Sequence, residues 1–258
     1  MLILLAASMG FLASLLSSIL GGGFGILSVP AIYWLMIHFY PNAPHAMQTT
    51  IATGGLCSIP LGIMASYKQR KYKNIDFKLF RSVVVIMVIG SMFGALLVTF
   101  LESDQLKYFF SFMVFIMAVW MLTFKYGRSK TLNLTKHVFN FFAFLVSTIS
   151  SLVGASIFSV PFFVLSGIEI KKAIGTSTLL VFIYSAISAI WLTCLGIPEM
   201  GISLDHIGYA NVPIFLSAIL PCLIGGIVGA KLVHILPSHI LKRIFVGMMF
   251  TVSITMLL

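Results

Sequence analysis

The feature that most constrains this chain is a short pattern that occurs once in each half. Gly21-Gly22-Gly23-Phe24-Gly25 interrupts an apolar stretch before Ser28-Val29-Pro30, and Gly154-Ala155-Ser156 does the same before Ser159-Val160-Pro161. Glycine weakens a helix, whereas serine followed by proline is typical of a helix start, with serine as the cap and proline in the first turn. The pattern predicts a broken hydrophobic helix in each half, which is typical of membrane transporters built from internal repeats.

The composition places the chain in a lipid bilayer. It is 60% hydrophobic and only 9% charged, with a mean hydropathy of +1.11, whereas a soluble domain carries about 25% charged residues. Apolar runs of spanning length cover residues 46–66, 79–100, 106–124, 173–195, 213–233 and 241–258, with longer regions at 1–40 and 137–166. These runs predict an all-α polytopic membrane protein with about eight spans by hydropathy and up to about ten helices.

The similarity between the halves extends over nearly the whole chain. Thr49-Thr50 corresponds to Thr176-Ser177, Asp76 corresponds to Asp205, and the Gly90 and Gly94 pair corresponds to Gly225 and Gly229. A duplication of this length predicts one transmembrane domain, residues 1–258, made of two internal repeats. The repeats cover residues 1–124 and 137–258, and a basic cytoplasmic linker at 125–136 joins them.

Equivalent loops of the two halves differ in charge. The loop at 67–81 holds six basic residues and Asp76, whereas its partner at 196–212 holds Glu199 and Asp205 and no lysine or arginine. Because cytoplasmic loops are rich in lysine and arginine, the two repeats are predicted to be inverted in the membrane. Regions 1–40 and 137–166 must then fold back, so each repeat is a broken-helix hairpin followed by three transmembrane helices. The sequence leaves open whether these hairpins cross fully or re-enter.

No carboxylate lies at an obvious mid-bilayer position of the predicted spans. All six acidic residues lie in loops or at span ends: Asp76, Glu102, Asp104, Glu169, Glu199 and Asp205. Transporters of metal cations or protons place ionisable groups inside the bundle, so cation transport is disfavoured. A helix that starts within the membrane presents unpaired N–H groups and the positive end of its dipole, which suit a small oxyanion.

The predicted substrate-binding residues are small or carry a hydroxyl, and they lie at the two breaks and at the start of the following helices. They are Gly21, Gly22, Gly23, Gly25, Ser28, Thr49, Thr50, Gly154, Ser156, Ser159, Thr176 and Ser177. Pro30 and Pro161 are predicted to be structural residues of the helix breaks.

Several of these residues have a structural alternative. Glycine and serine in membrane helices commonly permit close packing, and threonine often bonds back to a carbonyl four residues earlier. We assign packing to Gly90, Gly94, Gly225 and Gly229, and we leave the threonine and serine pairs open between the two roles. Asp76 and Asp205 are predicted to cap helices. The three cysteines, Cys57, Cys194 and Cys222, are predicted to be small core residues, with no disulfide or metal spacing.

The Gly-Gly-Gly-x-Gly run before Ser28-Val29-Pro30, the segment Ala46-Met47-Gln48-Thr49-Thr50 and the basic loop followed by Asp76 resemble the sulfite exporter TauE/SafE family of membrane proteins. The resemblance covers the full chain. It implies transport of small sulfur-containing anions, such as sulfite, thiosulfate or organosulfonates, across the cytoplasmic membrane. The second break departs from the family pattern, because Ala155, Ser156 and Phe158 stand where glycine or another small residue is usual.

Together, these observations predict a multi-pass transporter of the inner cytoplasmic membrane that exports a small sulfur-containing oxyanion by alternating access at a mid-membrane site. Its predicted partners are that anion and the bilayer. Nucleic acid is not expected as a partner, because the positive charge of the loops is explained by membrane orientation. No cofactor is expected. An enzyme is not expected either, because no HExxH, GxSG or mid-span pair of aspartates is present. The alternative is a non-transporting scaffold or assembly protein. The direction of transport, coupling to protons or sodium, and formation of a homodimer are left open.

Overall fold

The computed structural model describes residues 1–20, 23–41, 43–123, 135–232 and 238–257. In the first half, α1 (Leu2–Leu20) and α2 (Phe24–Phe39) form a hairpin before three long helices, α3 (Ala46–Lys71), α4 (Phe77–Phe100) and α5 (Ser103–Thr123). In the second half, α6 (Lys136–Val153) and α7 (Ser159–Leu165) precede α8 (Ile170–Leu195), α10 (Val212–Leu232) and α11 (Ser238–Leu257).

A small insertion distinguishes the second half. Between α8 and α10 lie the short helix α9 (Ile197–Met200) and an antiparallel hairpin of β1 (His206–Ile207) and β2 (Ala210–Asn211). In this hairpin His206 pairs with Asn211 and Ile207 pairs with Ala210.

The prediction of an all-α polytopic membrane protein is confirmed. Among the described residues, six helices are long and apolar enough to cross a membrane, so the figure of about eight spans stays a prediction. Long apolar side chains also remain on the outside: Leu4 of α1, Val85 of α4 and Phe112 of α5 are 75%, 64% and 59% exposed. A soluble protein rarely presents such faces, whereas lipid accepts them.

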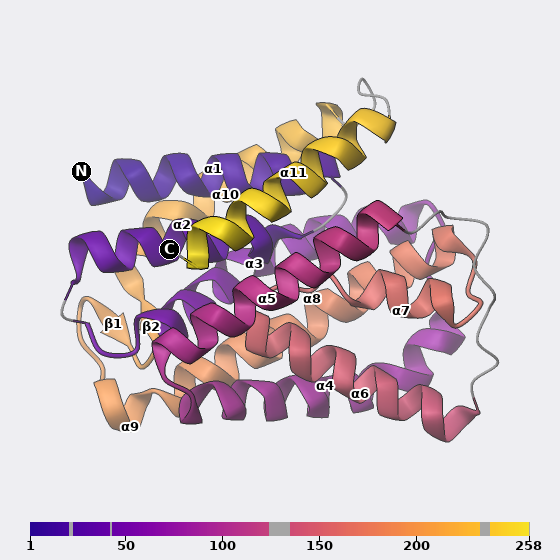
Figure 1. Ribbon diagram of the computed structural model, residues 1–258, viewed down its shortest axis with the longest axis horizontal. Helices are drawn as coiled ribbons and strands as arrows, with labels where there is room; N and C mark the ends of the chain where they lie inside the picture. The colour runs from indigo at the N-terminus through magenta and orange to yellow at the C-terminus, as the bar shows by residue number, and fades with distance from the viewer. Residues whose placement is uncertain (21–22, 42, 124–134, 233–237, 258) are drawn as a thin grey trace.

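The two hairpins open toward opposite ends of the molecule. Leu2 and Leu5 at the start of α1 pack in one cluster with Tyr40, which follows α2 near the start of α3. In the second hairpin, Phe139 near the start of α6 stacks on Phe162 of α7, with ring centroids 5.0 Å apart. This hairpin opens beside the loop between α3 and α4. Figure 1 shows the N-terminus, α9, β1 and β2 at one end and α7 toward the other.

We name the two ends by their charge. The basic end holds the loop at 67–81 and the start of α8, where Lys172 Nζ donates to the Lys73 carbonyl at 2.9 Å. The acidic end holds Glu102, Asp104, Glu199 and Asp205. The two ends therefore carry opposite charge, as the loop sequences predict.

Each hairpin packs against a long helix of the other half. A Cβ added at Gly94 of α4 would lie 2.4 Å from the Thr148 carbonyl oxygen of α6, and one added at Gly229 of α10 would lie 2.3 Å from the Leu15 carbonyl oxygen of α1. Such distances require glycine, so the predicted packing role of these glycine pairs is confirmed. The two halves thus exchange equivalent contacts, and neither forms a separate core.

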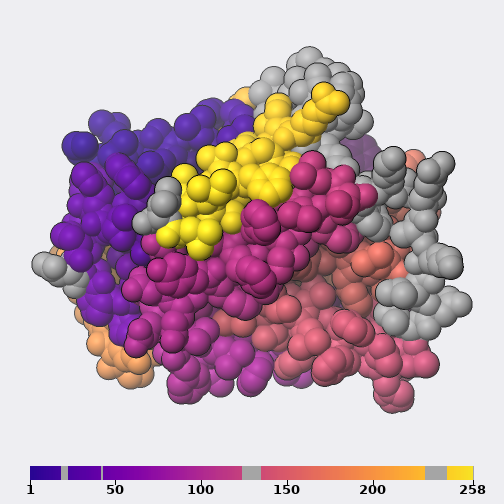
Figure 2. Space-filling view, in the orientation of Figure 1, coloured from indigo at the N-terminus to yellow at the C-terminus, as the bar shows by residue number. Residues whose placement is uncertain are grey.

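Helices α5 and α11 lie side by side on one face of the molecule (Figure 2). Ser253 Oγ of α11 donates to the Ser111 carbonyl of α5 at 2.8 Å, and the rings of Phe115 and Phe250 meet edge to face at 5.5 Å. Helix α5 is the last of the first half and α11 is the last of the second. Their pairing is therefore another contact between the two halves.

The predicted caps have different outcomes. Asp76 caps α4, because its side chain accepts hydrogen bonds from Lys78 N at 2.9 Å and Leu79 N at 3.1 Å. The prediction for Asp205 is wrong. The β-hairpin separates it from α10, and Asn211 Oδ1 accepts from Ile214 N at 2.9 Å in its place. Cys57 and Cys222 are buried as predicted, whereas Cys194 is exposed.

Candidate functional site

The two glycine breaks touch each other. A Cβ added at Gly25, in the first turn of α2, would lie 2.0 Å from the Gly154 carbonyl oxygen and 2.7 Å from Ala155 Cα. Main chain therefore meets main chain where the hairpin from the acidic end meets the hairpin from the basic end. Of the predicted break residues, Gly25 and Gly154 lie at this contact, whereas a Cβ added at Gly23 would meet Ile26 and Phe245 at 3.0 Å. Gly21 and Gly22 fall outside the described residues.

A left-handed backbone conformation makes each break. Gly23 has φ +82° immediately before α2, and Gly154 has φ +67° at the end of α6. Residues with a Cβ rarely adopt this conformation, so glycine is required at both positions. Gly154 also closes α6, because the N–H groups of Gly154 and Ala155 donate to the carbonyls of Ser151 and Ser150.

The predicted helix start is wrong in the first half and partly correct in the second. Helix α2 begins at Phe24, so Ser28 and Pro30 lie within it. The positive φ of Gly23 reverses the chain, and the helix can begin directly afterwards. Helix α7 begins at Ser159 with Pro161 in its first turn as predicted, but Ser159 makes no capping bond.

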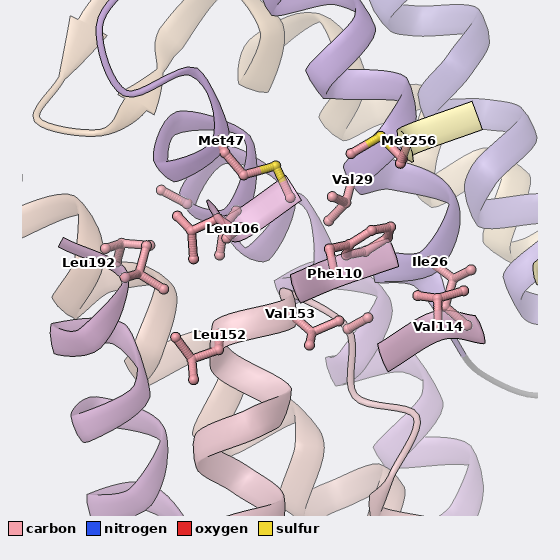
Figure 3. Close-up of a cluster of buried hydrophobic side chains, with 14 of the residues drawn as sticks. Ile26, Val29, Met47, Leu106, Phe110, Val114, Leu152, Val153, Leu192 and Met256 are labelled. Carbon is pink, nitrogen blue, oxygen red and sulfur yellow. The ribbon is translucent and has the colours of Figure 1, made fainter. Parts of the chain in front are cut away.

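Apolar side chains from both halves close around the contact (Figure 3). A Cβ added at Gly154 would lie 3.2 Å from Val29 and 3.3 Å from Ile51. Ile26 and Val29 of α2, Val153 of α6 and Phe110 of α5 are buried in the same cluster. The breaks are thus in direct contact within an apolar shell. A binding site between them would require the two breaks to move apart when the substrate is bound.

A ladder of hydroxyl groups joins the second hairpin to α8. Ser159 Oγ lies 2.9 Å from the Tyr184 hydroxyl, Ser156 Oγ lies 3.1 Å from Ser185 Oγ, and Ser151 Oγ bonds Ser188 Oγ. Sequence reasoning missed the α8 members of this ladder, although polar residues at 184, 185 and 188 recur at helical spacing in an apolar run. Ser156 and Ser159 therefore hold the hairpin to α8 in this conformation.

The first half lacks this ladder. Its equivalent of Ser159 is Ser28, and the equivalent of Tyr184 is Cys57. The buried Ser28 hydroxyl has no hydrogen-bond partner among the described residues. Ser28 lines a small internal cavity together with Cys57 and Cys222. The Cys57 side chain is smaller than that of Tyr184, so a cavity remains beside Ser28, whereas Tyr184 fills the equivalent space beside Ser159.

The threonine and serine pairs near the start of α3 and α8 differ in their hydrogen-bond partners. Thr50 Oγ1 donates to the Ala46 carbonyl at 2.8 Å, which is the structural alternative for this residue. Thr176 Oγ1 accepts from Asp76 N at 2.9 Å. Thr49 and Ser177 are buried, and their hydroxyls have no partner among the described residues.

Thr49 lies against a cavity of about 430 Å³ at the acidic end. The loop after α2, with Tyr40 and Pro44, forms one side of this cavity, and the β-hairpin of the second half forms another with Asp205, His206 and Asn211. Its volume falls within the range of small-molecule sites, which is about 300–1,000 Å³. Sequence reasoning missed His206 and Asn211, because nothing in the sequence brings the hairpin to the start of α3.

A polar cluster holds the two sides of this cavity together. His45 Nε2 lies 3.3 Å from Glu199 Oε2, and the same carboxylate accepts a hydrogen bond from the Tyr209 hydroxyl. Burial, with the hydrogen bond and negative charge of Glu199, raises the pKa of the Tyr209 phenol above its ordinary value. The phenol therefore stays protonated and remains a donor at neutral pH.

Comparisons with known proteins agree with this architecture. The family model for the sulfite exporter TauE/SafE matches residues 6–256. A probable membrane transporter protein of Haemophilus influenzae is 26% identical over 99% of this chain and 98% of its own length. Probable membrane transporter proteins of Methanocaldococcus jannaschii and Bacillus subtilis are each 24% identical, over 90% and 86% of this chain and 86% and 85% of their own lengths. No solved structure matches the chain at a significant level. The chain therefore belongs to the sulfite exporter TauE/SafE family and is a multi-pass membrane transporter.

Proposed function

We propose that this transporter exports a small sulfur-containing oxyanion, such as sulfite, thiosulfate or an organosulfonate, by alternating access at the level where the two breaks meet. The observation that carries this proposal is the contact of Gly25 with Gly154 and Ala155, where hairpins from opposite ends touch through main chain alone. An inverted repeat with re-entrant hairpins would bring its two helix breaks together in this way.

Backbone donors at this level favour an anion. Among the described residues, none accepts a hydrogen bond from the backbone N–H groups of Ser156, Ile157, Phe158, Ser159 or Val160. The N-terminal end of the sixteen-residue helix α2 approaches the same point. Unpaired N–H groups and the positive end of a helix dipole attract negative charge, and in an apolar shell that attraction is weakly screened. The candidate anion-binding residues at this level are Gly25, Gly154, Ser156 and Ser159, with Gly23 next to them in the chain. Gly21 and Gly22 are candidates from the sequence alone, because they lie outside the described residues.

The two ends of the molecule differ in a way that supports alternating access. At the basic end, the loop after α3 covers the start of α8: Asp76 N donates to Thr176, and a Cβ added at Gly175 would lie 2.3 Å from the Asn74 carbonyl oxygen. At the acidic end, the equivalent Thr49 has no such partner and borders the 430 Å³ cavity. Both threonines are buried, but Thr176 accepts a backbone hydrogen bond from the loop, whereas the residue Thr49 borders a cavity. In the opposite state of the transport cycle, the cavity would lie beside Thr176 at the basic end.

The direction of export follows from charge. If the basic end faces the cytoplasm, an anion that leaves the cell moves down the interior-negative potential and gains about 2.3 kcal/mol per charge per 100 mV. Export therefore requires no coupling carboxylate in the spans, and all six carboxylates lie at helix ends or in loops.

A labelling experiment tests this orientation. Single cysteines that replace Gln69 and Ser203, in a chain with Cys57, Cys194 and Cys222 replaced by alanine, are expected to react with an impermeant thiol reagent from opposite sides. Position 69 should label only from the cytoplasm, and position 203 only from outside, because the last turn of α3 and the segment that follows α9 lie at opposite ends of the molecule. Labelling of both positions from one side would contradict the inverted arrangement.

A flux assay tests the substrate class. Purified protein in lipid vesicles is expected to release sulfite, thiosulfate or ethanesulfonate with saturable kinetics, and an inside-negative potential should accelerate release. Flux of sodium or a divalent metal without flux of any anion would reject the substrate class. Intact, correctly inserted protein that moves none of these solutes would favour a scaffold or assembly role.

A further inference from the structure

We propose that the cavity at the acidic end is a binding site for an organic monoanion, namely a small oxyanion head on a short hydrocarbon chain, with Thr49, His206 and Asn211 holding the head. The inference rests on the proposed function, because it places an outer station on the transport path. It concerns a different location from the glycine breaks, and the hairpin that supplies two of its residues has no counterpart among the described residues of the first half.

The first observation is that two residues that line this cavity each carry a hydrogen-bonding atom without a partner. Thr49 Oγ1 and His206 Nδ1 are both shielded from water, and neither has a hydrogen-bond partner among the described residues. A buried polar atom without a partner destabilises the protein, so such atoms are rarely kept without a role. Ligand oxygen atoms would complete both hydrogen bonds once the two side chains turn toward the cavity.

The second observation is that Asn211 presents a third polar group beside Thr49. Asn211 N donates to Thr53 Oγ1 at 2.9 Å, one helical turn from Thr49, and Asn211 Oδ1 accepts from Ile214 N at 2.9 Å. With its carbonyl oxygen engaged, the side chain keeps its NH₂ group as a donor. The pairing of His206 with Asn211 in the β-hairpin fixes these two residues next to each other. The site therefore forms only when the hairpin of the second half docks on α3 of the first.

The lining also indicates the charge and shape of the ligand. No lysine or arginine lines the described cavity, and the exposed residue Asp205 is one of its lining residues. Hydroxyl and amide donors without a lysine or arginine favour one negative charge over two, because the cost of removing an ion from water rises steeply with its charge. Met36, Met200 and Ala43 supply apolar wall that a bare inorganic anion would leave uncovered. A short alkanesulfonate combines the two required parts.

The test is binding of ethanesulfonate to the full-length protein in lipid nanodiscs, measured by calorimetry. Thr49→Val is expected to weaken binding about tenfold, in line with one lost hydrogen bond to a charged group. Thr49→Ser, which keeps the hydroxyl, should bind within about twofold of the unmodified protein. Thr178→Val is the matched control, because Thr178 Oγ1 donates to the Ile174 carbonyl of its own helix at 2.8 Å. His206→Phe should weaken binding without loss of thermal stability.

Three outcomes would overturn the proposal. Equal affinity in Thr49→Val, His206→Phe and the unmodified protein would remove the site. Sulfate binding as tightly as ethanesulfonate would remove the preference for a monoanion. Absence of ethanesulfonate binding in a protein that transports sulfite would leave the proposed function standing and reject this site. Conversely, ethanesulfonate binding that responds to Thr49 in a protein without flux would keep the site and reject transport.

Discussion

Replacement of Gly25 by alanine is expected to lower anion flux in vesicles by about 5- to 150-fold, because an overpacked contact costs about 1–3 kcal/mol and each 1.4 kcal/mol is a factor of ten. The new Cβ would lie 2.0 Å from the Gly154 carbonyl oxygen and 2.7 Å from Ala155 Cα. Both are main-chain atoms and cannot rotate away. The turns of the two hairpins must therefore separate, and the donors at the breaks lose their arrangement.

Gly54→Ala is the matched control for this substitution. Gly54 lies in α3, and a Cβ there would meet Ser28 Oγ and Ile32 Cδ1 at 3.4 Å, which is ordinary contact. Alanine also favours a helix over glycine by about 0.5–1 kcal/mol, so this variant should keep its flux and its melting temperature. Flux is compared per mole of protein that elutes as a single species. Normal flux through Gly25→Ala would show that the contact between the breaks is not part of the transport path.

Gly175→Ala is expected to open the basic end. The loop after α3 packs against Gly175 of α8, and a Cβ at Gly175 would lie 2.3 Å from the Asn74 carbonyl oxygen and 2.6 Å from Asn74 Cβ. The loop must therefore lift away from the start of α8, which exposes position 176. In inside-out vesicles, a cysteine at position 176 should react with an impermeant thiol reagent at least about tenfold faster in the Gly175→Ala protein, which corresponds to a shift of roughly 1.4 kcal/mol in loop opening.

The control for this experiment is Gly247→Ala, which adds a methyl group on α11 where no atom of a neighbouring described element lies within 4 Å. It should leave the reaction rate at position 176 unchanged. An equal rate with and without Gly175→Ala would show that the loop at 72–76 does not close this end. A rise in rate combined with normal flux would show that loop closure is not a required step of transport.

The hairpins could be predicted from the sequence because their lengths conflict with the bilayer. Residues 1–40 would form a single helix roughly 60 Å long, about twice the hydrocarbon thickness, so the chain had to turn, and glycine marks the position. The outcome at Ser28 and Pro30 shows the limit of this reasoning. Their residue types predict a helix start, but the positive φ of Gly23 allowed α2 to begin at Phe24. A left-handed backbone conformation is a property of the folded chain, and the sequence did not show that Gly23 adopts it.

The roles of the candidate hydroxyl groups could not be predicted from the sequence. Thr49 and Thr176 occupy equivalent positions, yet Thr176 accepts from Asp76 N and Thr49 does not have a partner among the described residues. Ser159 bonds Tyr184, whereas Ser28 faces a smaller cysteine. Asn211 caps α10 in place of the predicted Asp205, because a β-hairpin separates Asp205 from that helix. In each case the deciding partner comes from a distant part of the chain.

By itself, the sequence determined that this chain lies in a membrane, that each half folds back at glycine and that charge separates its two ends. These properties follow from local composition, since apolar length, glycine content and loop charge act over a few turns of helix. Tertiary structure alone decided that Gly25 meets Gly154, that Thr176 is covered and that Thr49 borders a cavity with His206 and Asn211. The physical reason is that hydrogen bonds and close contacts depend on which surfaces the two halves present to each other, and residues far apart in the chain supply both sides.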